Sequence, residues 1–198
     1  MDARDLPEDW DGFRFRGGCN AIDLPATLQA RLSPSPRELL NSPDDLGRWL
    51  VSAGMAFRTQ KATAKDLSVV RALREAIYIL AGGRLGTEAE AARKTLNHIA
   101  GGASAVPSLQ PDGTMRLEGG AGAFLVTLAR EAVQLFGSEA ARLVRQCQSP
   151  TCTIYFVDTS RRGDRRWCSM SACGNKADRK STRLNSSHQG TSRMPSSA

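Results

Sequence analysis

The sequence has almost no histidine and lacks the patterns of an enzyme active site. Only two of its 198 residues are histidines, His98 and His188. No arrangement of serine, histidine and aspartate, or of cysteine and histidine, suggests a nucleophile with its base. No glycine motif lies between a strand and a helix, where it could hold a phosphate. His98 follows helical spacing beside Leu96 and Ile99, which favours a packed or partly exposed helical residue. We therefore expect a protein that is not an enzyme.

Long apolar runs are also missing. No segment approaches the roughly 20 consecutive apolar residues of a membrane span. The segment 1–13, MDARDLPEDWDGF, is acidic and polar, unlike a signal peptide. These features predict a cytoplasmic protein of one or two small domains. Five cysteines in such a protein indicate metal or redox chemistry before disulfides.

Positive charge is concentrated near the C-terminal end. The net charge is +7 at pH 7, which favours polyanionic partners such as nucleic acid. Between residues 145 and 176 there are six basic and two acidic residues. A zinc ion with four thiolates would add two negative charges there, so the positive charge of this region is modest.

Residues 1–140 are predicted to form a mainly helical domain with a small β element. Ser42 and Thr63 are N-cap candidates, and Thr63 is followed three residues later by Asp66, as in a capping box. Apolar residues recur at helical spacing, and glycines follow the helical segments. Helices are expected over residues 43–53, 63–80, 87–100, 123–136 and 139–146, and a hairpin over 105–118.

Four cysteines form two close pairs. Four residues separate Cys147 from Cys152 and Cys168 from Cys173, and fifteen residues lie between the pairs. Each pair can form a knuckle that turns two thiolates toward one point, while the loop brings the knuckles together. Four sulfur ligands in a tetrahedron are typical of zinc, and a site filled by protein leaves no water to activate. The spacing predicts a structural zinc ion.

Spacing alone leaves two disulfides or an iron–sulfur cluster as alternatives. The β-prone run 153–157 and the turn at 162–164 favour a hairpin between the two knuckles, and a helix can start after Cys173. Trp167 adjoins the third cysteine, where we expect it to cover the metal site. Residues 141–177 are thus predicted to form a four-cysteine zinc module with two knuckles, a β-hairpin and the start of a helix.

Two sequence motifs in this module resemble the CGNR zinc finger. They are Cys152-x3-Phe156-x-Asp158-x-Ser160 and Arg165-Arg166-Trp167-Cys168-Ser169-Met170-x2-Cys173-Gly174-Asn175. Roughly residues 13–140 resemble the ABATE domain that precedes this finger, through order, length and segments such as Ile22-Asp23-Leu24 and Asp44-Asp45-Leu46-x2-Trp49-Leu50. The resemblance implies a stress-response transcriptional regulator whose finger binds DNA. Lys176 departs from the motif, which has arginine there, and lysine lacks the bidentate fork of arginine.

Residues 178–198 differ in character from the rest of the chain. The run DRKSTRLNSSH resembles the conceptual translation of a common sequencing-adapter read. We therefore expect 178–198 to be a disordered tail foreign to the gene, and we set His188 aside as a ligand. In the family a basic helix continues the finger at this point, so part of the DNA-contacting surface is expected to be altered.

The function predicted from these features is a nucleic-acid-binding regulator in which a structural zinc ion presents arginines to DNA. An alternative is a protein-interaction or ligand-sensing module whose zinc ion is purely structural, and redox sensing by the cysteines stays open as well. The sequence is compatible with a homo-oligomer, and it identifies neither the oligomeric state nor a small-molecule signal. The candidate nucleic-acid contacts are Arg161, Arg162, Arg165, Arg166 and Lys176.

Overall fold

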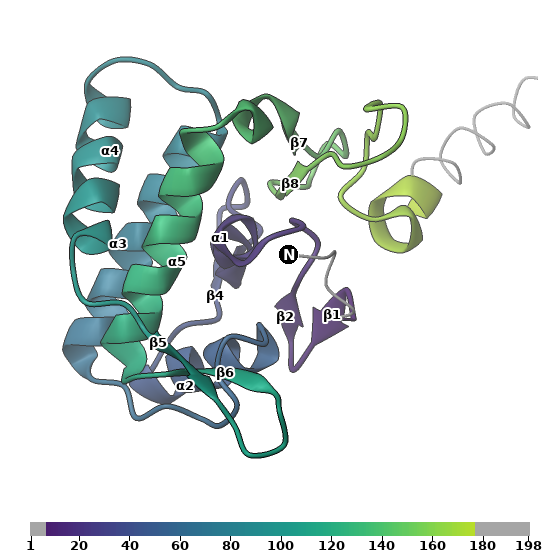
Figure 1. The fold of residues 1–198 in the computed structure, drawn as a ribbon. Coiled ribbons are helices and arrows are strands. Elements are labelled where there is room, and N and C mark those ends of the chain that lie inside the picture. Colours follow the sequence, from purple (N-terminus) through teal and green to yellow (C-terminus); the bar gives the residue numbers. More distant parts are fainter. Residues whose placement is uncertain (1–6, 177–198) are drawn as a thin grey trace, which may run out of the picture.

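Three long helices form the body of the protein. The computed structural model describes residues 7–176. Helices α3 (Ala64–Ala81), α4 (Thr87–Ala100) and α5 (Ala121–Phe136) pack against one another, and α2 (Pro43–Ser52) contacts both α3 and α5 (Figure 1). The prediction of a mainly helical fold is confirmed. Within residues 7–176 no helix combines the length and apolarity needed to cross a membrane.

The helix starts follow the predicted caps. The side chain of Ser42 accepts from the backbone N–H of Asp45, and the Asp45 carboxylate accepts from the N–H of Ser42. Thr63 and Asp66 make the same reciprocal pair at the start of α3. Each pair satisfies backbone donors that the first helical turn leaves without a partner.

The β structure consists of small antiparallel pairs. In the described part of the chain there are four two-stranded sheets. They are β1 (Asp9–Trp10) with β2 (Phe13–Arg14), β3 (Leu28–Gln29) with β4 (Arg37–Glu38), β5 (Val106–Leu109) with β6 (Met115–Glu118), and β7 (Val144–Gln146) with β8 (Tyr155–Val157). Short helical turns complete the fold: α1 (Asn20–Asp23), η1 (Leu24–Thr27), η2 (Glu139–Leu143) and η3 (Met170–Gly174).

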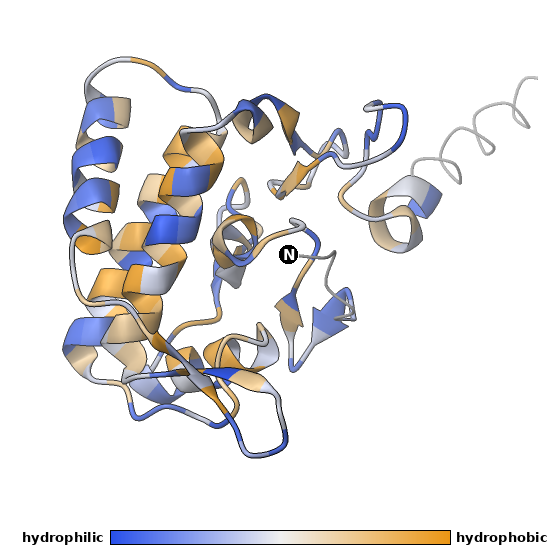
Figure 2. Cartoon of the chain, viewed as in Figure 1, coloured by the Kyte–Doolittle hydropathy of each residue, from blue (hydrophilic) through white to orange (hydrophobic). Residues whose placement is uncertain are grey.

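The main core lies between the helices and the N-terminal segment. Its largest fully buried side chains include Trp49 of α2, Leu73 of α3 and Phe124 of α5. Figure 2 shows the hydrophobic colour along α5, while much of α4 is hydrophilic. Full burial of a large apolar side chain stabilises a fold by about 1.5–3 kcal/mol, so this core holds the helices together.

Arg74, only 4% exposed, lies at the centre of an ionic network. Its guanidinium bonds to Glu38 of β4 at 2.7 Å and to Glu75 at 2.8 Å. Arg31 forms a second ion pair with Glu75 at 2.6 Å. The network ties the β3–β4 loop to α3, which the apolar pattern of α3 did not predict.

Strand β8 belongs to two hydrophobic clusters. Tyr155 and Val157 lie in the main core, whereas Phe156 packs in a second cluster with the cysteines. The Tyr155 ring lies 5.3 Å from that of Tyr78 on α3, and the N–H of Val157 donates to the carbonyl of Gly17 at 2.8 Å. Alternate side chains of a strand point to opposite faces, so β8 joins the cysteine region to the helical body.

Two local predictions were wrong. The helix expected over 139–146 is helical only in η2, and residues 144–146 form β7, because their pairing with β8 outweighs the helical spacing. The β-hairpin of the module is present, but β7 and β8 flank the first knuckle, and the hairpin does not lie between the two knuckles. The predicted tail 178–198 lies outside the described residues.

Candidate metal centre

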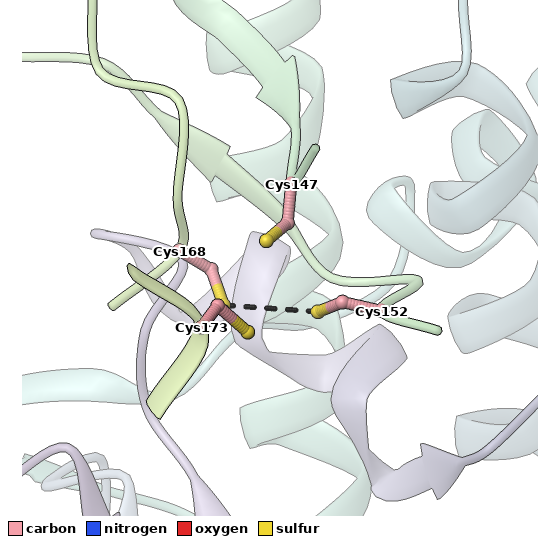
Figure 3. A group of neighbouring side chains, drawn as sticks. All are labelled: Cys147, Cys152, Cys168 and Cys173. Atoms are coloured by element: carbon pink, nitrogen blue, oxygen red, sulfur yellow. Dashed lines mark hydrogen bonds between the residues drawn. The ribbon is translucent and has the colours of Figure 1, made fainter. Parts of the chain in front are cut away.

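The four predicted cysteines come together. The sulfur atoms of Cys147, Cys152, Cys168 and Cys173 all lie within 4.8 Å of one another. The Sγ atom of Cys168 is 3.7 Å from that of Cys152 and 3.7 Å from that of Cys173. Figure 3 shows the cysteine side chains converging on one point. Cys147 follows β7, Cys152 lies in the turn after it, Cys168 precedes η3 and Cys173 lies within η3.

These distances fit a single tetrahedral ion. Zinc–thiolate bonds of about 2.3 Å place neighbouring sulfurs of a tetrahedron roughly 3.8 Å apart. A disulfide requires about 2.05 Å between sulfurs, and all four cysteines are free thiols here. A cluster of several irons binds its thiolates to different metal atoms and so spreads them farther apart than one ion does. The donor set therefore fits one soft, four-coordinate metal ion.

Ionisation of all four thiols would require a cation among them. The hydrogen bond from Cys168 lowers the pKa of Cys152 to about 5, so this thiol ionises first. The resulting thiolate, together with burial, raises the pKa of Cys168. Burial and the neighbouring charge raise the pKa of Cys173 to about 11. Four thiolates at these distances are stable only with a positive charge between them, which a bound divalent ion supplies.

Backbone hydrogen bonds shape both knuckles. In the first knuckle, the N–H of Cys147 donates to the carbonyl of Ile154 at 3.0 Å, and that of Cys152 to the carbonyl of Ser149 at 2.9 Å. In the second, the N–H of Cys173 donates to the carbonyl of Ser169 at 3.0 Å. The Ser169 hydroxyl accepts from a backbone N–H of η3 and so caps this turn. The ligand positions are thus fixed by the main chain.

Arg165 supports the second knuckle from inside. Its Nε donates to the carbonyl of Trp167 at 2.8 Å, and its Nη2 donates to the carbonyl of Cys168. The guanidinium lies 4.5 Å from the centre of the Phe156 ring. Its backbone N–H donates to Asp158 at 2.9 Å. Sequence reasoning grouped Arg165 with the nucleic-acid contacts and missed this positioning role.

Asp158 organises the loop between the knuckles. Its carboxylate accepts from the N–H and hydroxyl of Ser160, at 3.0 and 2.6 Å, and from the N–H of Arg165. The Ser160 hydroxyl, with the charge of Arg165, holds the pKa of Asp158 below its usual value. The Asp-x-Ser spacing in the sequence is the signal that could have predicted this local turn.

Apolar side chains cover the cysteines. Phe156 is fully buried, and Ile154 and Ala26 pack in the same cluster. Trp167 packs against it at the edge, where the sequence placed a cover for the site. This shell buries three of the four cysteines and leaves Cys152 partly exposed, and it joins the cluster to η1 of the helical body through Ala26.

The remaining candidate cations lie on the surface. Arg161, Arg162, Arg166 and Lys176 are exposed. Within residues 7–176 none of these four forms a salt bridge, and Arg166 donates from Nε to the side chain of Gln148 at 2.9 Å. Gly163 turns the loop beside the arginine pair with φ of +64°, which suits glycine. Their contact with nucleic acid stays a prediction.

The N-terminal segment reaches the second knuckle, which the sequence did not indicate. The Glu8 carboxylate accepts from the hydroxyls of Ser169 at 2.5 Å and Ser171 at 2.9 Å. Burial opposes the charge of Glu8, but the two serine hydrogen bonds and Arg16 lower its pKa. A contact between residues 161 positions apart leaves no periodic signal in a single sequence.

Comparison with known families agrees with this architecture. Residues 143–184 match the CGNR zinc finger, a match that includes residues 178–184 of the predicted foreign tail. Residues 20–139 match the family ABATE, described as "Putative stress-induced transcription regulator". No match was found among curated proteins. The CGNR match contains all four clustered cysteines, and the ABATE match covers more than half of the chain. The chain therefore belongs to the ABATE family and carries a CGNR zinc finger.

Proposed function

We propose that the protein is a non-enzymatic transcriptional regulator that binds DNA through its zinc-stabilised C-terminal module. The observation that carries the proposal is the four-cysteine cluster, whose 3.7 Å sulfur separations fit one zinc ion. Zinc would be held by Cys147, Cys152, Cys168 and Cys173, where it neutralises the thiolates. No ligand position remains for a water nucleophile, which supports a structural role.

Exposed cations beside a fixed scaffold support DNA as the partner. Arg161 and Arg162 occupy the loop tip, and Arg166 and Lys176 lie near the second knuckle. Arginines can contact phosphate oxygens and can also read guanine edges. The guanidinium of Arg165 donates to two backbone carbonyls, so its proposed role is to stabilise the conformation of the loop.

The zinc part of the proposal is tested by elemental analysis of the full chain purified without added metal. We expect one zinc ion per chain, and a Cys168→Ser variant that loses it together with the folded module, because metal-binding free energy here is folding free energy. A Cys19→Ser variant is the control, since Cys19 lies outside the cluster. Full zinc content in Cys168→Ser would refute the assignment, and iron in place of zinc would correct the metal.

The DNA part is tested by fluorescence anisotropy with a labelled duplex at several salt concentrations. Each lost phosphate contact should lower the slope of log K against log salt by about one unit, so Arg161→Gln/Arg162→Gln should lower it by about two. The control is Arg93→Gln/Lys94→Gln, which removes the same charge from an exposed position on α4. Equal slopes in both variants would exclude the loop as the DNA contact and favour an acidic protein partner.

A further inference from the structure

A second site lies on the helical body, away from the cysteines. A cleft of about 860 Å³ opens between the β5–β6 hairpin, the end of α2 with the loop after it, and α5. Its apolar lining includes Val51, Met55 and Ala56 from one side and Ala105, Met115 and Leu117 from the other. Pockets for small molecules in proteins span about 300–1,000 Å³ and have mostly apolar walls. The cleft has the size and lining of such a pocket.

The hairpin supplies one wall of the cleft, mainly through β6. Leu109 pairs directly with Met115, and Pro107 pairs with Leu117, so these four side chains share a face. Met115 and Leu117 line the cleft, whereas Leu109 and Pro107 do not. Met115 is 65% exposed and Leu109 79% exposed. Methionine side chains adapt to different apolar shapes, which suits a wall that meets a ligand.

The charged groups of the cleft already have partners. Arg130 donates to the carbonyls of Ala100 at 2.9 Å and Gly102 at 2.8 Å, and to the hydroxyl of Ser104 at 2.8 Å. Glu131 accepts from the N–H of Ala21 at 2.8 Å. Each guanidinium nitrogen of Arg130 is thus used within the fold, so this cation is poorly placed to bind an anionic ligand.

The other cation of the cleft is also engaged. The guanidinium of Arg116 lies 3.6 Å from the centre of the Phe57 ring and 3.8 Å from the Asp112 carboxylate. The stacked pair stands at the mouth of the cleft, where Phe57 is 71% exposed. An anionic ligand would compete with Asp112 for the Arg116 guanidinium, whereas a neutral apolar ligand would cover exposed ring and methionine surface.

We propose that this cleft binds a neutral, largely apolar small molecule, with the β5–β6 hairpin as one wall. Carboxylates and phosphates are disfavoured there, because Arg130 keeps three intramolecular hydrogen bonds and the Glu131 carboxylate adds a negative charge to the lining. The site is independent of the proposed DNA contacts, and none of the four cysteines lines it. It gives the helical domain a ligand-binding function of its own.

The test uses two fluorescent probes on the full zinc-loaded chain. N-phenyl-1-naphthylamine is neutral, and 8-anilino-1-naphthalenesulfonate has the same ring framework with one negative charge. We expect saturable 1:1 binding of the neutral probe, at least about tenfold tighter than that of the sulfonate. Equal or tighter sulfonate binding would overturn the assignment of a neutral ligand.

Two matched variants locate the site. Met115→Asp places a charge in the apolar wall and should weaken the neutral probe about tenfold or more, because binding would desolvate that charge. Leu85→Asp adds the same charge at a leucine that is 93% exposed and does not line the cleft, and it should leave the affinity unchanged. Equal effects of the two variants would refute the cleft as the binding site. If Met115→Asp instead converted a dimer to a monomer in light scattering, the cleft would be an interface between copies, and the proposal would fail.

Discussion

Replacing Arg165 by methionine should weaken zinc binding roughly 30-fold while leaving the cysteines in place. Methionine keeps apolar contact with Phe156 but removes two hydrogen bonds, to the carbonyls of Trp167 and Cys168. A hydrogen bond from a charged group contributes about 1.5–3 kcal/mol, and water replaces part of this at a half-buried site. A net loss of about 2 kcal/mol corresponds to roughly 30-fold in affinity. This lies within the 10- to 100-fold range typical of groups that hold metal ligands.

The assay is competition for zinc with a chromogenic chelator at neutral pH. Arg166→Met is the matched control, because it removes the same charge from the next position. There the side chain is exposed, bonds to the side chain of Gln148 and lies 5.1 Å from the centre of the Trp167 ring, without a hydrogen bond to a cysteine carbonyl. We expect the control to change zinc affinity by less than about threefold, a surface-substitution effect. If the two variants lost affinity equally, Arg165 would act through charge alone, and its positioning role would be refuted.

Three further changes test the packing and the ionic network. Phe156→Ala should destabilise the zinc-loaded chain by about 3–5 kcal/mol in urea unfolding, because it empties the centre of the cover over the cysteines. Burial would raise the pKa of Glu38, but the hydrogen bond from Arg74 outweighs it and lowers the pKa below 4.5. That pair therefore stabilises the fold fully above about pH 4.5 and loses its contribution as pH falls through the lowered pKa. In thermal unfolding, Glu38→Gln should therefore reduce the fall of the melting temperature at acid pH. A pH dependence of the melting temperature equal to that of the unmodified chain would contradict this expectation. Gly17→Ala should lower the free energy of unfolding by about 1–3 kcal/mol, because a Cβ atom there would lie 2.7 Å from an α1 side chain. Gly120→Ala is the control, since a Cβ atom there meets nothing within 4 Å, and it should leave the free energy of unfolding nearly unchanged.

Local hydrogen bonding explains what the sequence predicted well. The caps of α2 and α3 rest on side chains three residues apart, Ser42 with Asp45 and Thr63 with Asp66, so a short window of sequence contains the whole interaction. The cysteine pairs are local in the same sense, since each knuckle closes through backbone bonds among neighbouring residues. The metal-ligand set could therefore be predicted from spacing.

The features that the sequence did not predict depend on distant partners. The side chain of Arg165 packs on the Phe156 ring and donates to two carbonyls. Its neighbours Arg161 and Arg162 look equivalent in sequence. Residues 144–146 read as the end of a helix, and only pairing with β8 makes them a strand. Glu8 reaches Ser169 across most of the chain. In each case tertiary contact selects among conformations that the local sequence allows.

The alternation of β8 determines how the metal centre is connected to the helical domain. Phe156 faces the cysteines, while Tyr155 and Val157 on either side of it face the main core. Any shift of this strand that moves Phe156 must also move side chains packed on α3 and the Gly17 carbonyl that accepts from Val157. A one-residue slip would bury the wrong side chains on both faces, so the register is strongly specified. The finger therefore cannot reorient freely on a flexible linker. Its exposed arginines are presented by a module that packs on the helical body through β8, which favours contact with a partner surface of defined shape.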